Sequence, residues 1–220
     1  MIAGWYKRWT PNLRDLASLP TECLARLLLG TLLVCDDPAP KTTGIIIETE
    51  AYLGVRDRAC HAFGGRKTPR LSVLWSDPGL AYVYSMHTRW LLNITTQPEG
   101  VPECVLVRAL WPIEGIGAMA ERRVHPVHEP PRRIELASLV SGPGRLCQAM
   151  GISKRHYGVR LLDEASPLRL VEAADEDLAA AGVIEGAPIA SGPRIGVSRA
   201  GNDALLPLRF WIQGNPLVSR

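Results

Sequence analysis

The run 44–54 constrains this chain most, because an apolar stretch passes directly into acidic and aromatic residues. Three consecutive isoleucines begin the run, and β-branched side chains of this kind predict a buried strand. Side chains alternate along a strand, so Glu48, Glu50 and Tyr52 are expected on one face. Burial disfavours an ionised carboxylate, so such a group either pairs with an arginine or is a candidate general base.

Two stretches downstream carry residue types that suit a nucleic acid. The segment Gly64–Arg70 combines glycine amides, basic side chains and a hydroxyl, which suit phosphate oxygens, although many basic loops are only solvated loops. The segments Leu80–Tyr84 and Trp90–Thr95 predict the two strands of a β-hairpin. Tyr82 and Tyr84 are expected to share a face of that hairpin.

The predicted secondary structure is mixed, with more strands than helices. Helices are predicted at Pro20–Leu29, Ile113–Arg123, Arg145–Met150 and within Asp163–Ala181, further strands at Thr31–Cys35, Thr43–Tyr52, Cys104–Leu110, Ile195–Val197 and Leu208–Gln213, and a proline-rich loop at His125–Arg133. Because few βαβ units occur, we expect an α+β fold around a curved, mostly antiparallel sheet flanked by helices. All 220 residues are expected to form one compact domain, with 1–19 as a flexible or loosely packed N-terminal segment.

The composition of the chain excludes few classes of function. The formal charge of +3 and the sequence pI of about 8.7 favour an anionic partner. The five cysteines are scattered and odd in number, which is typical of reduced thiols in a cytosolic protein, and the Cys and His spacings do not predict a metal site. The sequence shows neither a signal-peptide core nor an apolar run of about 20 residues, so we expect a cytoplasmic protein that does not enter a membrane.

The order of these blocks resembles that of the alkyladenine (3-methyladenine) DNA glycosylase family, in its single-domain mammalian and bacterial form. The matching blocks are ETEAYLG at Glu48–Gly54, DxxxH at Asp57–His61, GGRxTPR at Gly64–Arg70, YVY at Tyr82–Tyr84, Asn93, VLVRAL at Val105–Leu110, SGPGRLCQAMGI at Ser141–Ile152, RIGV at Arg194–Val197 and PLRFWIQGNPLVS at Pro207–Ser219. Together they extend from about residue 20 to the end of the sequence. The resemblance implies the same α+β fold, with a protruding β-hairpin for the DNA minor groove.

The resemblance also implies a reaction in base excision repair. A damaged purine, alkylated as in 3-methyladenine or else hypoxanthine or ethenoadenine, rotates out of the duplex, and its N-glycosidic bond is hydrolysed. Glu50 matches the family's water-activating carboxylate, and Glu48 matches a residue that is not the base. Arg108 matches an arginine that helps to hold the water, and its charge is expected to lower the pKa of Glu50. The implied partner is double-stranded DNA, bound by a monomer without a cofactor or a metal.

Four residues match the family's base pocket. Tyr52 and Tyr84 match aromatic walls against which the extruded base stacks. His61 matches a residue that hydrogen-bonds the base or the adjacent phosphate. Asn93 matches a residue that crowds the 2-amino group of guanine, which would exclude that base by a steric clash.

The DNA-binding residues are expected on the basic loop and at the hairpin tip. The candidate phosphate contacts are Arg66, Lys67, Thr68, Arg70 and Arg145. The family usually carries a tyrosine at the hairpin tip that wedges into the minor groove, but the tip here, Ser85–Arg89, has none. Met86 and His87 are the candidates to replace it, since apolar wedges such as methionine kink a duplex in this way.

Other functions remain open at this point. A DNA-binding protein of the same fold could sense alkylation damage with little or no turnover, although it would have no need for Glu50. A glycosylase with lyase activity requires an amine nucleophile, for which Lys67 is the lysine on the basic loop. A nucleoside hydrolase would cleave the same kind of bond in free nucleosides.

Overall fold

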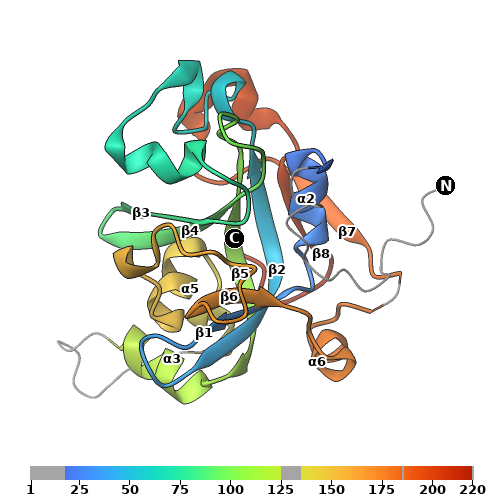
Figure 1. Cartoon of the computed structure of the whole chain (residues 1–220). Helices are drawn as coiled ribbons and strands as arrows, with labels where there is room; N and C mark the ends of the chain where they lie inside the picture. The colour runs from blue at the N-terminus through green and yellow to red at the C-terminus, as the bar shows by residue number, and fades with distance from the viewer. Residues whose placement is uncertain (1–17, 125–134, 185, 220) are drawn as a thin grey trace.

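The computed structural model describes residues 18–124, 135–184 and 186–219, and this part forms an antiparallel sheet with flanking helices (Figure 1). The strands are β1 (Leu32–Cys35), β2 (Thr42–Tyr52), β3 (Ala81–Met86), β4 (Arg89–Thr95), β5 (Cys104–Glu114), β6 (Leu168–Val171), β7 (Ile189–Gly192) and β8 (Arg209–Ile212). The helices are α2 (Thr21–Leu27), α3 (Ile116–Arg123), α4 (Leu136–Leu139), α5 (Pro143–Met150) and α6 (Asp175–Ala180). Short 3₁₀ turns are η1 (Gly54–Arg56), η2 (Phe63–Gly65), η3 (Pro69–Trp75), η4 (Lys154–His156) and η5 (Ser198–Leu205).

The strand order is β3-β4-β5-β2-β1-β6, with β8 also paired to β2 and β7 paired to β8. Each of these pairs is antiparallel, so the predicted α+β fold is confirmed. The predicted loop His125–Arg133 and most of the predicted segment 1–19 lie outside the described residues.

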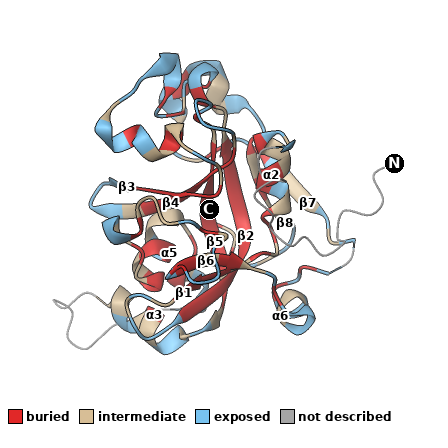
Figure 2. Cartoon of the chain, viewed as in Figure 1, coloured by how far each residue is buried: buried red, intermediate tan, exposed pale blue. Residues whose placement is uncertain are grey.

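The long strands β2 and β5 form the centre of the sheet, and α2 and α5 lie on either side of them (Figure 1). The three isoleucines of β2 are fully buried, as the β-branched run predicts, and both strands are buried over most of their length (Figure 2). Thr49, between the two glutamates of β2, faces α2 and donates its hydroxyl to the carbonyl of Ala25 (2.7 Å). The glutamates therefore face away from α2.

Two irregularities interrupt the pairing of β2 with β5 beside these glutamates. Ile46 pairs with Leu110 and Glu48 with Ala109, so Ile47 is passed over on β2. Thr49 then pairs with Val107, so Arg108 is passed over on β5. Such bulges bend a strand and redirect its side chains, and they are common next to active sites.

The predicted β-hairpin is present and forms one edge of the sheet (Figure 1). Met86 pairs with Arg89, which leaves His87 and Thr88 as a two-residue turn. Both turn residues have positive φ, 47° and 66°, as a type I′ turn requires. Met86 and His87 are exposed at this tip.

Some predicted elements differ from the structure. The predicted strand Ile195–Val197 is wrong, because this segment is a bend around Gly196, whose φ is +78°. Strand β6 (Leu168–Val171) was not predicted, since it lies inside the segment 163–181, which was expected to contain only loop and helix. Strand β5 continues to Glu114, so α3 begins three residues later than predicted.

The described residues also contain five free cysteines, of which Cys23 alone is partly exposed. Within these residues no group of three or more His, Cys, Asp and Glu side chains could hold a metal ion. No helix in this part of the chain is long and apolar enough to cross a membrane.

Candidate active site

Glu50 lies near the end of β2, and its carboxylate is fully buried. Its Oε1 accepts a hydrogen bond from the backbone N–H of Ile195 (2.7 Å) and lies 3.1 Å from NH1 of Arg108. Its Oε2 accepts the hydroxyl hydrogen bond of Tyr52 (2.9 Å). The predicted common face of β2 is therefore confirmed for Glu50 and Tyr52.

The bulge on β5 places the guanidinium of Arg108 between the two glutamates of β2. Its Nε donates to Oε1 of Glu48 (3.0 Å), while NH1 faces Glu50. The passed-over residue is not left unpaired, because the backbone N–H of Gly142 donates to the carbonyl of Arg108 (2.9 Å). The segment Ser141–Ile152, which the family resemblance singled out, is thus attached to this site.

The positive charge of Arg108 is only one of the influences on the pKa of Glu50. Burial raises the pKa of Glu50 above its ordinary value of 4.5, against the lowering effects of Arg108, the Ile195 amide and the Tyr52 hydroxyl. Glu48 adds to the rise through its negative charge. Arg108 thus lowers the pKa as expected, but the net pKa is raised, because removal of this carboxylate from water outweighs one nearby guanidinium.

The four predicted pocket residues lie together beside Glu50. The rings of His61 and Tyr84 are 4.4 Å apart between centroids. A small cavity is enclosed by the side chains of Tyr52, Ala59, Cys60, His61, Leu74, Tyr82, Tyr84, Asn93 and Cys104. Its volume of about 20 Å³ holds roughly one water molecule. Tyr52 connects this cavity to the carboxylate of Glu50.

Tyr82 forms a hydrogen bond with His61 beside this cavity. Burial, Arg70 and Arg66 lower the pKa of His61, which favours the neutral ring. Burial raises the pKa of Tyr82, so its phenol stays protonated. Its oxygen lies 2.7 Å from Nδ1 of His61, within hydrogen-bond distance. The hydroxyl donates when Nδ1 carries no proton and accepts when it carries one, so the contact fits either tautomer of the neutral ring.

Asn93 is buried in the cavity wall and held by two contacts. Its Nδ2 donates to the carbonyl of Tyr82 (3.2 Å), and the thiol of Cys104 donates to its Oδ1 (3.8 Å). Because both ends of the amide are engaged, the side chain occupies a fixed position in the wall.

A buried ion pair between Asp57 and Arg194 supports the site, although the sequence alone did not assign it a role. Arg194 donates from NH2 to Oδ1 of Asp57 (2.9 Å) and from NH1 to the carbonyl of Ala51 (3.0 Å). Burial raises the pKa of Asp57, but the hydrogen bonds from Arg194 and two backbone amides outweigh it, so the net pKa is lowered. The guanidinium also lies 4.8 Å from the ring centroid of Tyr52. Arg194 thereby fixes both Tyr52 and the adjacent amide of Ile195.

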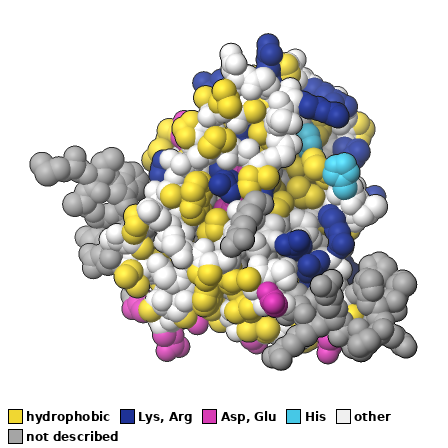
Figure 3. Space-filling model, turned by 180° about the vertical axis from the view of Figure 1, so that it is seen from behind, with side chains coloured by type: hydrophobic (Ala, Val, Ile, Leu, Met, Phe, Trp, Pro, Cys, Tyr) yellow, Lys and Arg dark blue, Asp and Glu magenta, His cyan; other side chains and the backbone are white. Residues whose placement is uncertain are grey.

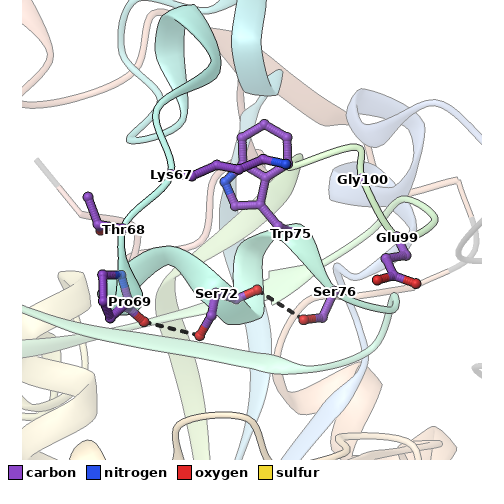
Figure 4. Close-up of a pocket in the computed structure, with 8 residues that line it drawn as sticks. All are labelled: Lys67, Thr68, Pro69, Ser72, Trp75, Ser76, Glu99 and Gly100. Atoms are coloured by element: carbon purple, nitrogen blue, oxygen red, sulfur yellow. Dashed lines mark hydrogen bonds between the residues drawn. The ribbon is translucent and has the colours of Figure 1, made fainter.

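The basic loop lies beyond the cavity, with Arg66, Lys67 and Arg70 exposed and Thr68 partly buried. Its backbone is anchored, because Trp75 Nε1 donates to the carbonyl of Arg66 (3.2 Å). Lys67 does not enter the aromatic cavity. Its ammonium lies 4.3 Å from the ring centroid of Trp75 and borders a separate, open hollow of about 520 Å³ on the outer side of η3 (Figure 4).

A second basic cluster lies where α3, α5 and β4 meet. Arg89 and Arg123 both donate to Oε1 of Gln148, Arg123 at 2.9 Å. Burial and the nearby charges of Arg145 and Arg89 lower the pKa of Arg123. Sequence reasoning identified only Arg145 of these three arginines. Figure 3 shows basic side chains gathered along one flank of the molecule, close to histidine side chains.

Comparisons with known proteins match almost the whole length of this chain. The model of the family described as methylpurine-DNA glycosylase (MPG) matches residues 15–216. A candidate 3-methyladenine DNA glycosylase of Oceanobacillus iheyensis is 40% identical over 97% of this chain and 98% of its own length. One of the same name from Bacillus subtilis is 38% identical over 90% of each chain. The chain belongs to the methylpurine-DNA glycosylase family.

Proposed function

We propose that the protein is a monofunctional DNA glycosylase, which extrudes a damaged purine from duplex DNA and hydrolyses its N-glycosidic bond. The observation that carries this proposal is the buried Glu50 carboxylate at the edge of an aromatic cavity. Its contacts with Arg108 and Ile195 hold it in a defined position. Family membership and the names of the relatives support a methylpurine glycosylase of DNA repair.

Glu50 is suited to act as a general base. It would take a proton from a water molecule that attacks C1′ of the extruded nucleotide. Its negative charge would also stabilise the positive charge that develops on the sugar. Because burial raises its pKa, Glu50 binds a proton more strongly than an exposed carboxylate does. Activity should therefore fall as the pH decreases through this raised pKa.

The cavity is suited to a purine only after it opens. At about 20 Å³ it cannot hold a base, so Tyr52 must separate from His61 and Tyr84 as the nucleotide enters. A cationic alkylated purine between these rings would gain roughly 0.5–2 kcal/mol of cation–π energy. Asn93 would exclude guanine, because its two hydrogen bonds prevent it from moving aside.

Phosphate binding is assigned to the basic loop and the arginine cluster, and Arg66→Ala tests the first of these. We expect the variant to bind all duplexes more weakly and to reduce the slope of log affinity against log salt by about 1. Arg155→Ala is the control, since Arg155 is also exposed but pairs with Asp37. The affinity of each variant for duplex DNA, measured over a series of salt concentrations, tests this expectation. A changed lesion preference would place Arg66 in the base pocket instead.

The hairpin tip is assigned as the wedge that fills the space left by the extruded base. The change His87→Asn removes the ring but keeps a residue that tolerates positive φ. We expect excision to slow by about tenfold in a stable base pair and much less in a mismatch, where extrusion costs less. Single-turnover rates on matched and mismatched duplexes measure this. The assignment would be contradicted if His87→Asn slows excision equally on matched and mismatched duplexes and Met86→Ala has no effect on excision.

The position of Lys67 supports a monofunctional enzyme rather than a lyase. Its ammonium contacts Trp75 outside the aromatic cavity (Figure 4). A lyase would form a covalent imine between an amine and the sugar, and borohydride would trap it. Trapping of a Lys67 adduct would show that the monofunctional assignment is wrong.

The proposed function is tested by base release from oligonucleotides that each carry one lesion. We expect release of 3-methyladenine from duplex DNA, without strand cleavage. Release from free nucleosides at a similar rate would identify a nucleoside hydrolase. Tight binding of the lesion duplexes without release would identify a damage sensor.

A further inference from the structure

Glu48 is fully buried, yet the proposed mechanism gives it no part. Its Oε1 accepts hydrogen bonds from Nε of Arg108 (3.0 Å), NH1 of Arg209 (3.2 Å) and the hydroxyl of Ser219 (2.8 Å). Its Oε2 accepts the backbone N–H of Ser219 (2.6 Å). A buried carboxylate with this many donors is held in one orientation.

Ser219 connects Glu48 to Arg108 through a single hydroxyl group. While Oγ donates to Glu48, it accepts from Nε (3.3 Å) and NH2 (3.0 Å) of Arg108. One hydroxyl provides one donor and two acceptor positions, and all of them are used here. The residue itself is held by Arg209, whose NH1 donates to the carbonyl of Ser219 (3.2 Å).

These contacts involve one edge of the Arg108 guanidinium and leave NH1 directed at Glu50 (3.1 Å). We propose that Glu48 and Ser219 are positioning residues, which hold Arg108 in the orientation that places NH1 against the catalytic carboxylate. The inference rests on the proposed function, since it assumes that Glu50 is the base. It adds the segment after β8 to the catalytic centre.

Arg108 needs such support because it lies in a bulge of β5, where its backbone has no partner on β2. A free arginine side chain has many rotamers, and fixing it requires acceptors of matching geometry. Misplacement of a catalytic group by about 1 Å can lower a rate by about 100-fold. Loss of these acceptors should therefore reduce catalysis more than DNA binding.

Glu48 also acts on Glu50 through its charge. The charged and titratable groups that face Glu50 are Arg108 from β5, Glu48 and Tyr52 from β2, Tyr84 from β3, Arg194 from the segment before Ile195, and Arg209 from β8. Of these, Glu48 is the carboxylate, and its charge raises the pKa of Glu50. Arg108 lowers the same pKa, so a displaced Arg108 should move the acid limb of the pH–rate profile to higher pH wherever Glu48 keeps its charge.

The test uses Ser219→Ala and Glu48→Gln, with Thr49→Val as the matched control. Thr49 is buried on the same strand, but its hydrogen bond to Ala25 lies on the opposite face. We expect the single-turnover rate of base release to fall by roughly tenfold for Ser219→Ala and 100-fold for Glu48→Gln. Affinity for a duplex with an abasic-site mimic should change less than about threefold. The acid limb should move to higher pH in Ser219→Ala, which keeps the charge of Glu48 but loosens the hold on Arg108.

A purely structural role would give a different pattern. If Ser219→Ala releases base as fast as Thr49→Val and keeps the wild-type acid limb, the positioning role is wrong. Failure of the proposed function would instead appear as a wild-type protein that releases no methylated purine. If Ser219→Ala does not fold, the rate of base release by Glu48→Gln decides, and a rate equal to that of Thr49→Val would show that the positioning role is wrong.

Discussion

The change Glu50→Gln is expected to lower the single-turnover rate of base release by about 1,000-fold, within the range that a general base contributes. Glutamine keeps the shape of the side chain but cannot take a proton from water. Duplex binding should persist, because the aromatic cavity and the basic loop are unchanged. Base release from a 3-methyladenine duplex, with affinity for an abasic-site duplex measured in parallel, checks this. Glu103→Gln is the control, since this carboxylate contacts Thr21 and not the cavity.

The same variant should be more stable than the wild type at neutral pH. Folding raises the pKa of Glu50, so the folded wild-type protein favours the protonated form and loses stability as the pH rises through that pKa. Glutamine carries no charge at any pH. The stability advantage of the glutamine variant should therefore be absent below the ordinary carboxyl pKa of 4.5 and grow as the pH increases.

Retained turnover in Glu50→Gln would contradict the catalytic role. In that case Glu50 is not the base, and Glu48 is the next candidate.

The change Arg108→Met should have the largest effect on folding. Glu48 and Glu50 are both fully buried, and the substitution removes the guanidinium that contacts both of them. Breaking a buried pair in this way costs about 3–5 kcal/mol, which is a large share of the stability of a typical domain. We expect the free energy of unfolding at pH 7 to decrease by this amount, with loss of base release.

The pH dependence identifies the cause of this loss. Without Arg108, the pKa of Glu50 should rise further on folding, so the folded state favours its protonated form. The deficit against the wild type should therefore shrink as the pH falls towards the carboxyl value of unfolded chains, about 4.3. Urea unfolding of both proteins at several pH values measures this difference in the free energy of unfolding. Arg108→Lys, which keeps the charge but not the planar fork, should lie between the two proteins. A deficit that does not vary with pH would show that lost packing, and not unpaired charge, destabilises the variant.

The sequence predicted the elements that depend on local pattern. The β-branched run and the alternation of Glu48, Glu50 and Tyr52 predicted β2 within one residue and its polar face. The hairpin was also predicted, because two strand-like segments are separated by a short polar turn. The family resemblance then identified Arg108 and four residues that line the aromatic cavity, Tyr52, His61, Tyr84 and Asn93.

The sequence could not predict features that depend on pairing between distant segments. The bulge at Arg108 arises from the register of β5 against β2, and no local signal marks it. The predicted strand around Ile195 failed because Gly196 allows a bend, which directs the Ile195 amide at Glu50. The sequence indicated both burial and a nearby arginine for Glu50, but the net direction of its pKa depends on their balance in the folded chain. Ser219 lay within a matching block, but only the folded chain shows its contact with Arg108.

The most direct measurement of the central claim is a crystal structure of the protein bound to a duplex that carries an abasic-site mimic. If Glu50 activates the attacking water, an ordered water molecule should lie within hydrogen-bond distance of its carboxylate. The same water should be about 3–3.5 Å from the position of C1′, with the sugar turned out of the helix. A sugar that remains stacked in the duplex, or a Glu50 carboxylate that neither water nor C1′ approaches, would contradict the account.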